Sequence, residues 1–150
     1  MMTIEEIMTT EPYTISPKET VYNARLLMQK HDVRHIPVVD KNNIPVGVIT
    51  FSDVLAASES SLHEQSEDSR TALEKQHRVR EVMTAPVATV DENDSLRSAA
   101  LHLLDTKHGC LPVTKEGGLV GIITDSDFVD VAVNLMEIME QQTLESDSFD

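Results

Sequence analysis

Two short strings carry the side chains best suited to contact a ligand. Thr50-Phe51-Ser52-Asp53 and Thr124-Asp125-Ser126-Asp127 each place a carboxylate three residues after a threonine that ends an apolar run. An ionised carboxylate accepts two hydrogen bonds at once, so it can hold a pair of neighbouring hydroxyl groups. The same spacing also forms a capping box at the start of a helix. Both roles stay open at this point, and one residue can serve both.

Other chemistries find little support in the residue types. The glycines form neither G-x-x-x-x-G-K nor G-x-G-x-x-G, so no phosphate loop is predicted. The six histidines are scattered, and the single cysteine, Cys110, provides no zinc cluster and no intramolecular disulfide. Cys110 precedes an apolar strand, which predicts a buried small hydrophobic residue rather than a nucleophile. No nucleophile–base constellation is present, so the chain is predicted not to be an enzyme.

Composition excludes several classes of partner. Twelve Lys and Arg stand against 26 Asp and Glu, a formal charge of −14, and this field repels a nucleic-acid backbone. Only 3% of the residues are aromatic, too few for a base-stacking platform. No apolar run reaches the roughly 18 residues of a membrane helix, and the acidic N-terminus is unlike a signal peptide. The sequence therefore predicts a free-standing cytoplasmic protein with no nucleic-acid partner and no membrane insertion.

The second half of the chain repeats the first. Three blocks match in order, at an offset of 75 before a single-residue gap and of 74 after it. Such ordered matching indicates an internal duplication. The matching pairs are Glu6-Ile7-Met8-Thr9 with Glu81-Val82-Met83-Thr84, Ile36-Pro37-Val38 with Leu111-Pro112-Val113, and Gly47-Val48-Ile49-Thr50 with Gly121-Ile122-Ile123-Thr124.

Each copy has the same predicted order of elements, β-α-β-β-α after a short helical lead-in that Thr3 and Glu6 can cap in the first copy. One copy buries little core alone, so the predicted fold is α/β (α+β), with the two repeats packed sheet to sheet about a pseudo-two-fold axis. The first β segments are predicted at 13–15 and 88–90, with the following helices starting at Ser16 and Asp91. The hairpin strands are predicted at 35–39 and 46–50, and at 110–114 and 119–124.

The chain divides into four predicted parts. The first repeat is 1–57, a polar linker is 58–77, the second repeat is 78–133, and a helix extension with an acidic tail is 134–150. The linker is interpreted as a surface connection, partly helical or mobile. An apolar stripe from Phe128 through Leu135 to Met139 predicts that the last helix runs to about Gln142. We interpret this stripe as intramolecular packing, with a dimer contact as the alternative.

The two copies together resemble a CBS-domain pair, also called a Bateman module. Their order and repetition carry the resemblance, which covers about residues 3 to 132. The matching elements are Ile7-Met8-Thr9, Thr14-Ile15, Arg34-His35-Ile36-Pro37-Val38-Val39-Asp40 and Gly47-Val48-Ile49-Thr50-Phe51-Ser52-Asp53, then Val82-Met83-Thr84, Thr89-Val90, Leu111-Pro112-Val113 and Gly121-Ile122-Ile123-Thr124-Asp125-Ser126-Asp127.

The resemblance implies a ligand class and an assembly. CBS pairs bind adenosine-containing ligands such as AMP, ADP, ATP or S-adenosylmethionine, commonly form homodimers, and regulate an associated protein. By this resemblance Asp53 and Asp127 hold the ribose hydroxyls. The hydroxyls of Thr50 and Thr124, with Ser52 and Ser126 in the same turns, meet a phosphate together with the helix N-termini. The adenine is expected against Ile36, Pro37, Leu111 and Pro112, and against backbone groups at Thr14, Ile15, Thr89 and Val90.

The two sites are expected to differ. Arg34 and His35 stand where many CBS domains direct a cation to a phosphate, whereas the second copy has Gly109-Cys110 there. The family often has Arg where Ser52 and Ser126 stand, so tight polyphosphate binding is not expected. The leading hypothesis is therefore a nucleotide-sensing regulatory module with one or two occupied sites. The alternative is a dimerisation or protein-interaction module with vestigial clefts.

Overall fold

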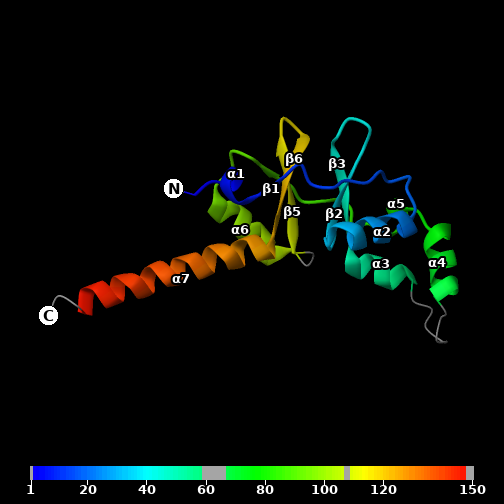
Figure 1. Cartoon of the computed structure of the whole chain (residues 1–150). Helices are drawn as coiled ribbons and strands as arrows, with labels where there is room; N and C mark the ends of the chain where they lie inside the picture. The colour runs from blue at the N-terminus through cyan, green and yellow to red at the C-terminus, as the bar shows by residue number, and fades with distance from the viewer. Residues whose placement is uncertain (1, 59–66, 107–108, 148–150) are drawn as a thin grey trace.

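The computed structural model describes residues 2–58, 67–106 and 109–147. These residues form the predicted succession of helices and strands twice, side by side (Figure 1). The elements are α1 (Ile4–Ile7), β1 (Thr9–Thr10), α2 (Val21–His31), β2 (His35–Val39), β3 (Pro45–Thr50), α3 (Phe51–Ser58), α4 (Glu67–Gln76), α5 (Val79–Val82), β4 (Val90–Asp91), α6 (Leu96–Asp105), β5 (Cys110–Lys115), β6 (Gly118–Thr124) and α7 (Asp125–Asp147).

Side-chain caps set where the helices begin. The hydroxyl of Thr3 accepts the Glu6 N–H at 3.3 Å, as the sequence predicts. Helix α2 begins at Val21 behind a Thr20 cap rather than at Ser16. The Ser16 hydroxyl instead accepts the Lys18 N–H at 3.2 Å and closes a local turn. The predicted helix start was wrong there because serine stabilises such turns as readily as it caps helices.

The second repeat shows the same shift. Helix α6 begins at Leu96 behind a Ser95 cap, whereas the Asp91 carboxylate accepts the Asn93 N–H in a turn at 2.9 Å. Of the residues predicted to form a strand at 13–15, only Ile15 makes a β-bridge, to Val38, so the first β segment of this repeat is shorter than predicted. Strand β1, at Thr9–Thr10, is a separate strand in the lead-in.

Both predicted hairpins are present. Strand β2 pairs antiparallel with β3, and β5 pairs antiparallel with β6. Each hairpin carries a bulge at an equivalent place, between Val38 and Val39 and between Val113 and Thr114. The sheets stand next to each other at the centre, and a small cluster of Val48, Cys110 and Ile122 lies between them. The predicted fold, two α/β repeats with their sheets facing, is confirmed.

The two repeats exchange their lead-in segments. Strand β1, which opens the first repeat, pairs with β6 of the second, Thr9 opposite Ile122. The equivalent Thr84 pairs with Val48 of β3, through backbone hydrogen bonds of 2.9 and 3.1 Å. The buried side chains follow the same exchange. Ile4 belongs to the core of the second repeat, and Val79 belongs to the core of the first.

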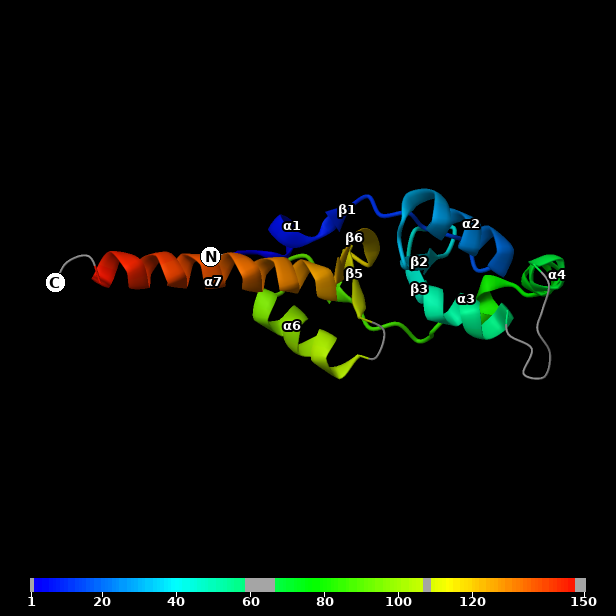
Figure 2. The same ribbon diagram turned by 60° about the horizontal axis from the view of Figure 1, so that its bottom comes forward.

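Helix α4 lies within the segment that the sequence presents as a polar surface connection. It packs on α2 and α3, at the far end of the first repeat from α7 (Figure 2). Glu74 of this helix has no exposed surface, and both of its carboxylate oxygens accept the Arg25 Nε–H, at 2.6 and 2.9 Å. The Ser58 hydroxyl donates to the same carboxylate at 2.9 Å.

Helix α7 continues well past the body of the second repeat. It ends at Asp147 rather than near Gln142, and both views show it running away from the first repeat. Phe128 packs against the core of the second repeat, but Leu135, Ile138 and Met139 are 50 to 64% exposed. The interpretation of this stripe as intramolecular packing was therefore wrong beyond its first turns. Within the described ranges no helix is long and apolar enough to span a membrane.

Candidate functional site

Two clefts lie where the repeats meet, and we call them cleft A and cleft B. Cleft A has a volume of about 840 Å³ and cleft B about 310 Å³. Cleft A is lined by residues 9–13, 32–35, 109, 122 and 124–126. Cleft B is lined by Val48, Thr84, Pro86, Val87, Ala88, Asp105, Thr106 and Cys110.

The two clefts are equivalent under the internal duplication. Thr9 and His35 of cleft A correspond to Thr84 and Cys110 of cleft B at the offset of 75, and Ile122 corresponds to Val48 at the offset of 74. Each cleft therefore joins the lead-in of one repeat to the last strand of the other. This composition follows directly from the exchanged lead-ins.

The threonine–aspartate strings cap their own helices. The Asp53 carboxylate accepts the Thr50 N–H at 2.9 Å, and the Thr50 hydroxyl accepts the Asp53 N–H at 3.1 Å. In the second repeat the Asp127 carboxylate accepts the Thr124 N–H at 2.8 Å. These bonds place each carboxylate in the first turn of α3 or α7. A carboxylate that accepts one backbone hydrogen bond keeps lone pairs for further donors.

Burial raises the pKa of the Asp127 carboxyl above its usual range, and the nearby charge of Asp130 raises it further. The hydrogen bond from Thr124 opposes this shift by favouring the ionised form. The Asp127 carboxylate is therefore less well solvated than an ordinary surface aspartate. A ligand that donates hydrogen bonds to it would replace part of the missing water.

Arg34 and His35 lie in cleft A, together with Thr124 and Ser126 of the other repeat. The cations of the first repeat thus face the aspartate-bearing turn of the second. Sequence reasoning did not assign them to either aspartate, because an alignment of repeats shows which residues are equivalent but not which ones meet. The Arg34 guanidinium lies 5.8 Å from the centre of the Phe51 ring.

Gly109 makes room for an acid at the floor of cleft A. It has a φ of +68°, and a Cβ added there would come 2.6 Å from an Asp125 carboxylate oxygen and 3.7 Å from His35 Nε2. Asp125, Glu11 and Asp32 all line cleft A beside Arg34 and His35. The cleft therefore presents both signs of charge rather than a uniformly positive surface.

Among the residues that the structure describes, the lining of cleft B contains no Lys or Arg. Cys110 stands where cleft A has His35, and burial, followed by the charges of Asp125 and Asp53, raises the pKa of its thiol to about 12. The thiol stays protonated near neutral pH and is a poor nucleophile. Because the charge of Asp53 acts on Cys110, the first repeat's aspartate lies near the second repeat's strand.

Most residues expected against an adenine lie in the cores of the repeats. Ile36, Pro37, Leu111 and Pro112 are buried in β2 and β5, and none of them lines cleft A or cleft B. Val90 is also a core residue, and Thr89 precedes it at the surface. Thr14 and Ile15 line a separate hollow with Lys18 and Asp40. Ser52 is exposed at the start of α3.

The lead-in residues are the part of the clefts that sequence reasoning missed. Thr9, Thr10 and Tyr13 line cleft A, and Tyr13 stacks on His31 with ring centres 3.7 Å apart. Pro86, Val87 and Ala88 take the matching places in cleft B. A signal for them was available, because the Met-Thr of each lead-in is one of the best-matched parts of the duplication.

Among the described residues, no three His, Cys, Asp or Glu side chains come together to hold a metal.

Comparison with known proteins identifies the architecture. The CBS domain family matches residues 4–60 and 79–134. The chain belongs to the CBS domain family. A CBS domain-containing protein of Bacillus subtilis (strain 168), YhcV, is 31% identical over 136 residues, which are 91% of this chain and 87% of that protein.

Solved CBS pairs have the same fold. The crystal structure of AcuB from Vibrio cholerae, named for acetoin utilization, superposes with a TM-score of 0.74 at 39% identity, over 94% of this chain and 97% of that one. CBSX2, a CBS-pair protein of Arabidopsis thaliana, has been crystallised in complex with AMP. That complex superposes with a TM-score of 0.71 at 29% identity, over 89% of this chain and 98% of CBSX2.

Proposed function

We propose that this CBS pair is a regulatory module that binds an adenosine-type ligand in cleft A and relays its presence to a partner protein. One observation carries the proposal: Thr124, Asp125 and Ser126, which lead directly into Asp127, line one cleft with the cations of the first repeat. Ribose hydroxyls would donate to the Asp127 carboxylate. The ligand's anionic group would meet Arg34, His35 and the N-terminal N–H groups of α7.

The size and chemistry of cleft A support a nucleoside ligand. Its volume of about 840 Å³ lies within the usual range for small-molecule sites. Ile122, Val33 and Pro12 provide apolar surface for a base, while Thr9 and Thr10 add polar groups beside it. The AMP complex of CBSX2, a relative of the same fold, supports the ligand class.

The charges of cleft A bear on the choice among adenosine ligands. Glu11, Asp32 and Asp125 would oppose a polyphosphate, whereas one Arg and one His suffice for a single phosphate or a carboxylate. We propose AMP or S-adenosylmethionine ahead of ATP. We propose cleft B as the weaker site, because it is smaller and its lining, as far as the structure describes it, contains no Lys or Arg.

Regulation would follow from the exchanged lead-ins. A ligand in cleft A would contact the lead-in of one repeat and the last strand and helix of the other. Its binding would therefore favour one placement of the repeats over another, and a partner protein would sense the difference. We propose that the chain works without catalysis, as a homodimer in the cytoplasm.

Isothermal titration calorimetry on two aspartate variants tests the ligand site. We expect the wild-type chain to bind AMP, Asp127→Ala to lose that binding, and Asp53→Ala to retain it, because the charge of Asp53 acts on Cys110 in the lining of cleft B. Glu137→Ala is the matched control, since Glu137 is an exposed acid farther along α7. A thermal melt of each variant shows that it is folded. AMP binding that survives Asp127→Ala would leave an interaction module with vestigial clefts as the better account.

A further inference from the structure

The turn of the first hairpin is bonded to the second repeat. Asn43 lies in the turn between β2 and β3, and its carbonyl oxygen accepts the Leu119 N–H at 2.9 Å. Its side-chain amide donates to the Leu119 carbonyl oxygen, also at 2.9 Å. Leu119 belongs to β6, so both bonds join one repeat to the other. We call this pair of hydrogen bonds the Asn43 clamp.

The turn holds Asn43 in place for these bonds. The Asp40 carboxylate accepts the N–H groups of Asn42 and Ile44, at 2.8 and 3.0 Å. Backbone hydrogen bonds from Asn43 to Asp40 and from Asp40 to Ile44 close the turn. Asn43 has a φ of +65°, a conformation that asparagine adopts more readily than most residues. The clamp is therefore made by a preformed turn rather than by a loose loop.

The residues of the second hairpin cannot make the mirror contact. At the offset of 74, Asn43 corresponds to Gly117, and Leu119 corresponds to Pro45. Gly117 has no side-chain amide, and Pro45 has no N–H to donate. Gly117 also stands in open space, since a Cβ added there would meet none of the described atoms within 4 Å beyond its chain neighbours. The clamp thus breaks the two-fold symmetry of the repeats on one side only.

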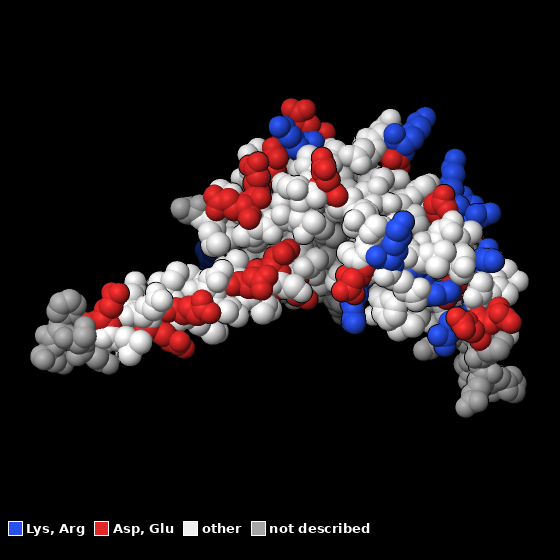
Figure 3. Space-filling model, viewed as in Figure 1, with Lys and Arg blue, Asp and Glu red and all other residues white. Residues whose placement is uncertain are grey.

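The clamp lies at the far end of the hairpins from cleft A. Both hairpins have their turns at one end of the sheets (Figure 1), and Figure 3 shows charged side chains of both signs over these turns. His35 at the start of β2 and Thr124 at the end of β6 line cleft A at the other end. The length of β2 puts the clamp about 15 Å from the cleft along the strands. Asn43 is exposed, so water competes for the clamp and makes it a modest, reversible contact.

The repeats touch again between the clamp and cleft A, where the lead-ins cross. Thr9 pairs with Ile122 near the middle of β6, and Thr84 pairs with Val48 near the middle of β3. A change of angle between the hairpins at this crossing would move their turns and the walls of cleft A in opposite directions. A contact that holds the turns together therefore also sets how far apart the cleft walls stand.

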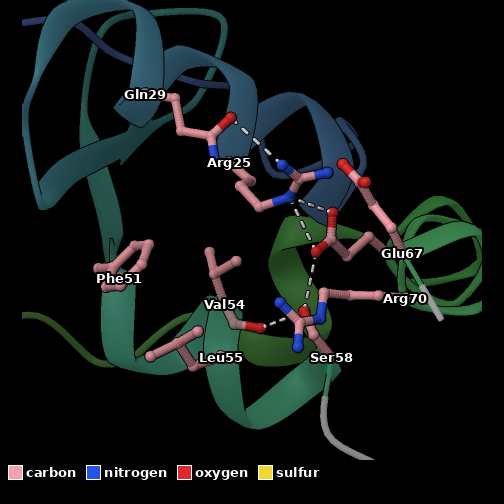
Figure 4. A pocket seen from close by; sticks show the side chains of 9 residues that line it. Arg25, Gln29, Phe51, Val54, Leu55, Ser58, Glu67 and Arg70 are labelled. Carbon is pink, nitrogen blue, oxygen red and sulfur yellow. Dashed lines mark hydrogen bonds and ion pairs between the residues drawn. The ribbon is translucent and has the colours of Figure 1, made fainter. Parts of the chain in front are cut away.

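The buried ion pair of the first repeat shows the difference between support and positioning. Arg25 and Glu74 are 49 positions apart, and they fasten α4 to α2 (Figure 4). Helix α4 packs on α2 and α3 of the first repeat. That pair therefore supports one repeat, whereas the Asn43 clamp joins the hairpins of both.

We infer that Asn43 is a positioning residue, which bonds to Leu119 and so holds the two hairpins at the angle that cleft A needs for its ligand. This inference rests on the proposed function, because it concerns the ligand of that cleft. A placement fixed in advance spares the ligand the cost of ordering the two repeats. Because ligand and clamp favour the same placement, each strengthens the other.

Calorimetry with AMP on variants of the turn tests this role. Asn43→Asp keeps the shape of the side chain but replaces the amide donor by a carboxylate oxygen opposite the Leu119 carbonyl. We expect its AMP affinity to fall by about five- to tenfold, the effect of one lost hydrogen bond. Asn42→Asp is the matched control, because it adds the same charge one residue away and its N–H bonds within the turn. It should bind AMP like the wild type, and an Asn43→Asp chain that did so too would overturn the inference.

Hydrogen exchange separates positioning from plain support of the fold. AMP should slow exchange of the Leu119 N–H by about fivefold in the wild-type chain, although this amide lies far from the cleft. In Asn43→Asp the slowing should disappear. Leu119 exchange that does not respond to AMP in a wild type that binds it would overturn the inference.

Residual dipolar couplings of the ligand-free chains decide the matter without AMP. They measure the angle between the β2–β3 and β5–β6 hairpins and show at the same time that each variant is folded. We expect one angle in the wild type and in Asn42→Asp, and a different or averaged angle in Asn43→Asp. Equal angles in all three chains would overturn the inference, whereas failure of the wild type to bind AMP would count against the proposed function alone.

Discussion

At the scale of single residues, Asp127 has two tasks that draw on the same carboxylate. It caps α7 by accepting the Thr124 N–H, and in the proposed function it also accepts ribose hydroxyls. Ionisation of the carboxyl strengthens both tasks. Burial opposes the ionised form and raises the pKa of this carboxyl above its usual range. The folded chain therefore gains stability from Asp127 when it is protonated, and this gain is lost as pH rises through the raised pKa.

Ligand binding should show the opposite dependence on pH. We expect the affinity for adenosine to fall as pH is lowered, beginning above the range of an ordinary aspartate, about pH 4. Adenosine is a better probe than AMP, because the AMP phosphate itself titrates at about pH 6 and would add its own pH dependence. Calorimetry between neutral and acid pH measures the effect. Asp127→Asn should weaken adenosine binding and remove its pH dependence. If the affinity of this variant still falls as pH is lowered, another group causes the dependence.

Residue spacing predicted part of this site and missed the rest. The T-x-x-D strings left ligand binding and helix capping both open, and the hydrogen bonds at Thr50 and Asp53 show the capping role. Spacing could not reveal that Arg34 faces the second repeat's turn, because that depends on how the repeats are docked. The apolar runs at Ile36-Pro37 and Leu111-Pro112 suit a core strand and a ligand wall equally well, and the structure places them in the core.

At the scale of elements, α4 is the feature least accessible from sequence. Its residues are polar, and glutamate is rarely fully buried, so a surface connection was the natural interpretation. Glu74 is nevertheless enclosed, because Arg25, 49 positions earlier, and Ser58 satisfy its carboxylate. Lys75 adds a contact 4.8 Å from the centre of the Tyr22 ring. Packing between such distant positions leaves no periodic trace in the chain.

The buried pair predicts how α4 responds to mutation. Glu74→Ala should lower the free energy of unfolding by about 3 kcal/mol, because it leaves the Arg25 charge without its partner in a partly buried place. Replacing both residues, with Arg25→Met and Glu74→Leu, should cost less than the single change. Glu67→Ala, an exposed acid on the same helix, is the control and should shift stability by less than about 0.5 kcal/mol. Urea denaturation compares the four chains.

A double variant no more stable than Glu74→Ala would contradict this account. It would mean that the pair acts through shape alone, with the charge of Arg25 already satisfied by water and Gln29.

At the scale of the whole molecule, the exchanged lead-ins make the two repeats one folding unit. Neither repeat completes its core without a helix from the other, because Ile4 and Val79 are each buried across the boundary. The crossing backbones come close at two equivalent glycines. A Cβ on Gly47 would lie 2.6 Å from Met83 Sδ and 2.9 Å from the Thr84 carbonyl oxygen, and one on Gly121 would lie 2.5 Å from Met8 Sδ.

These contacts predict that one methyl group at the crossing destabilises both repeats together. Gly47→Ala should lower the free energy of unfolding by about 1–3 kcal/mol, since the Thr84 backbone as well as Met83 must move. Gly118→Ala is the matched control, because the nearest atom to its added Cβ is 3.6 Å away, an ordinary contact. Calorimetry should show a single transition at a lower temperature for Gly47→Ala. Two separate transitions would mean that each repeat holds its fold alone and that the exchange merely joins them.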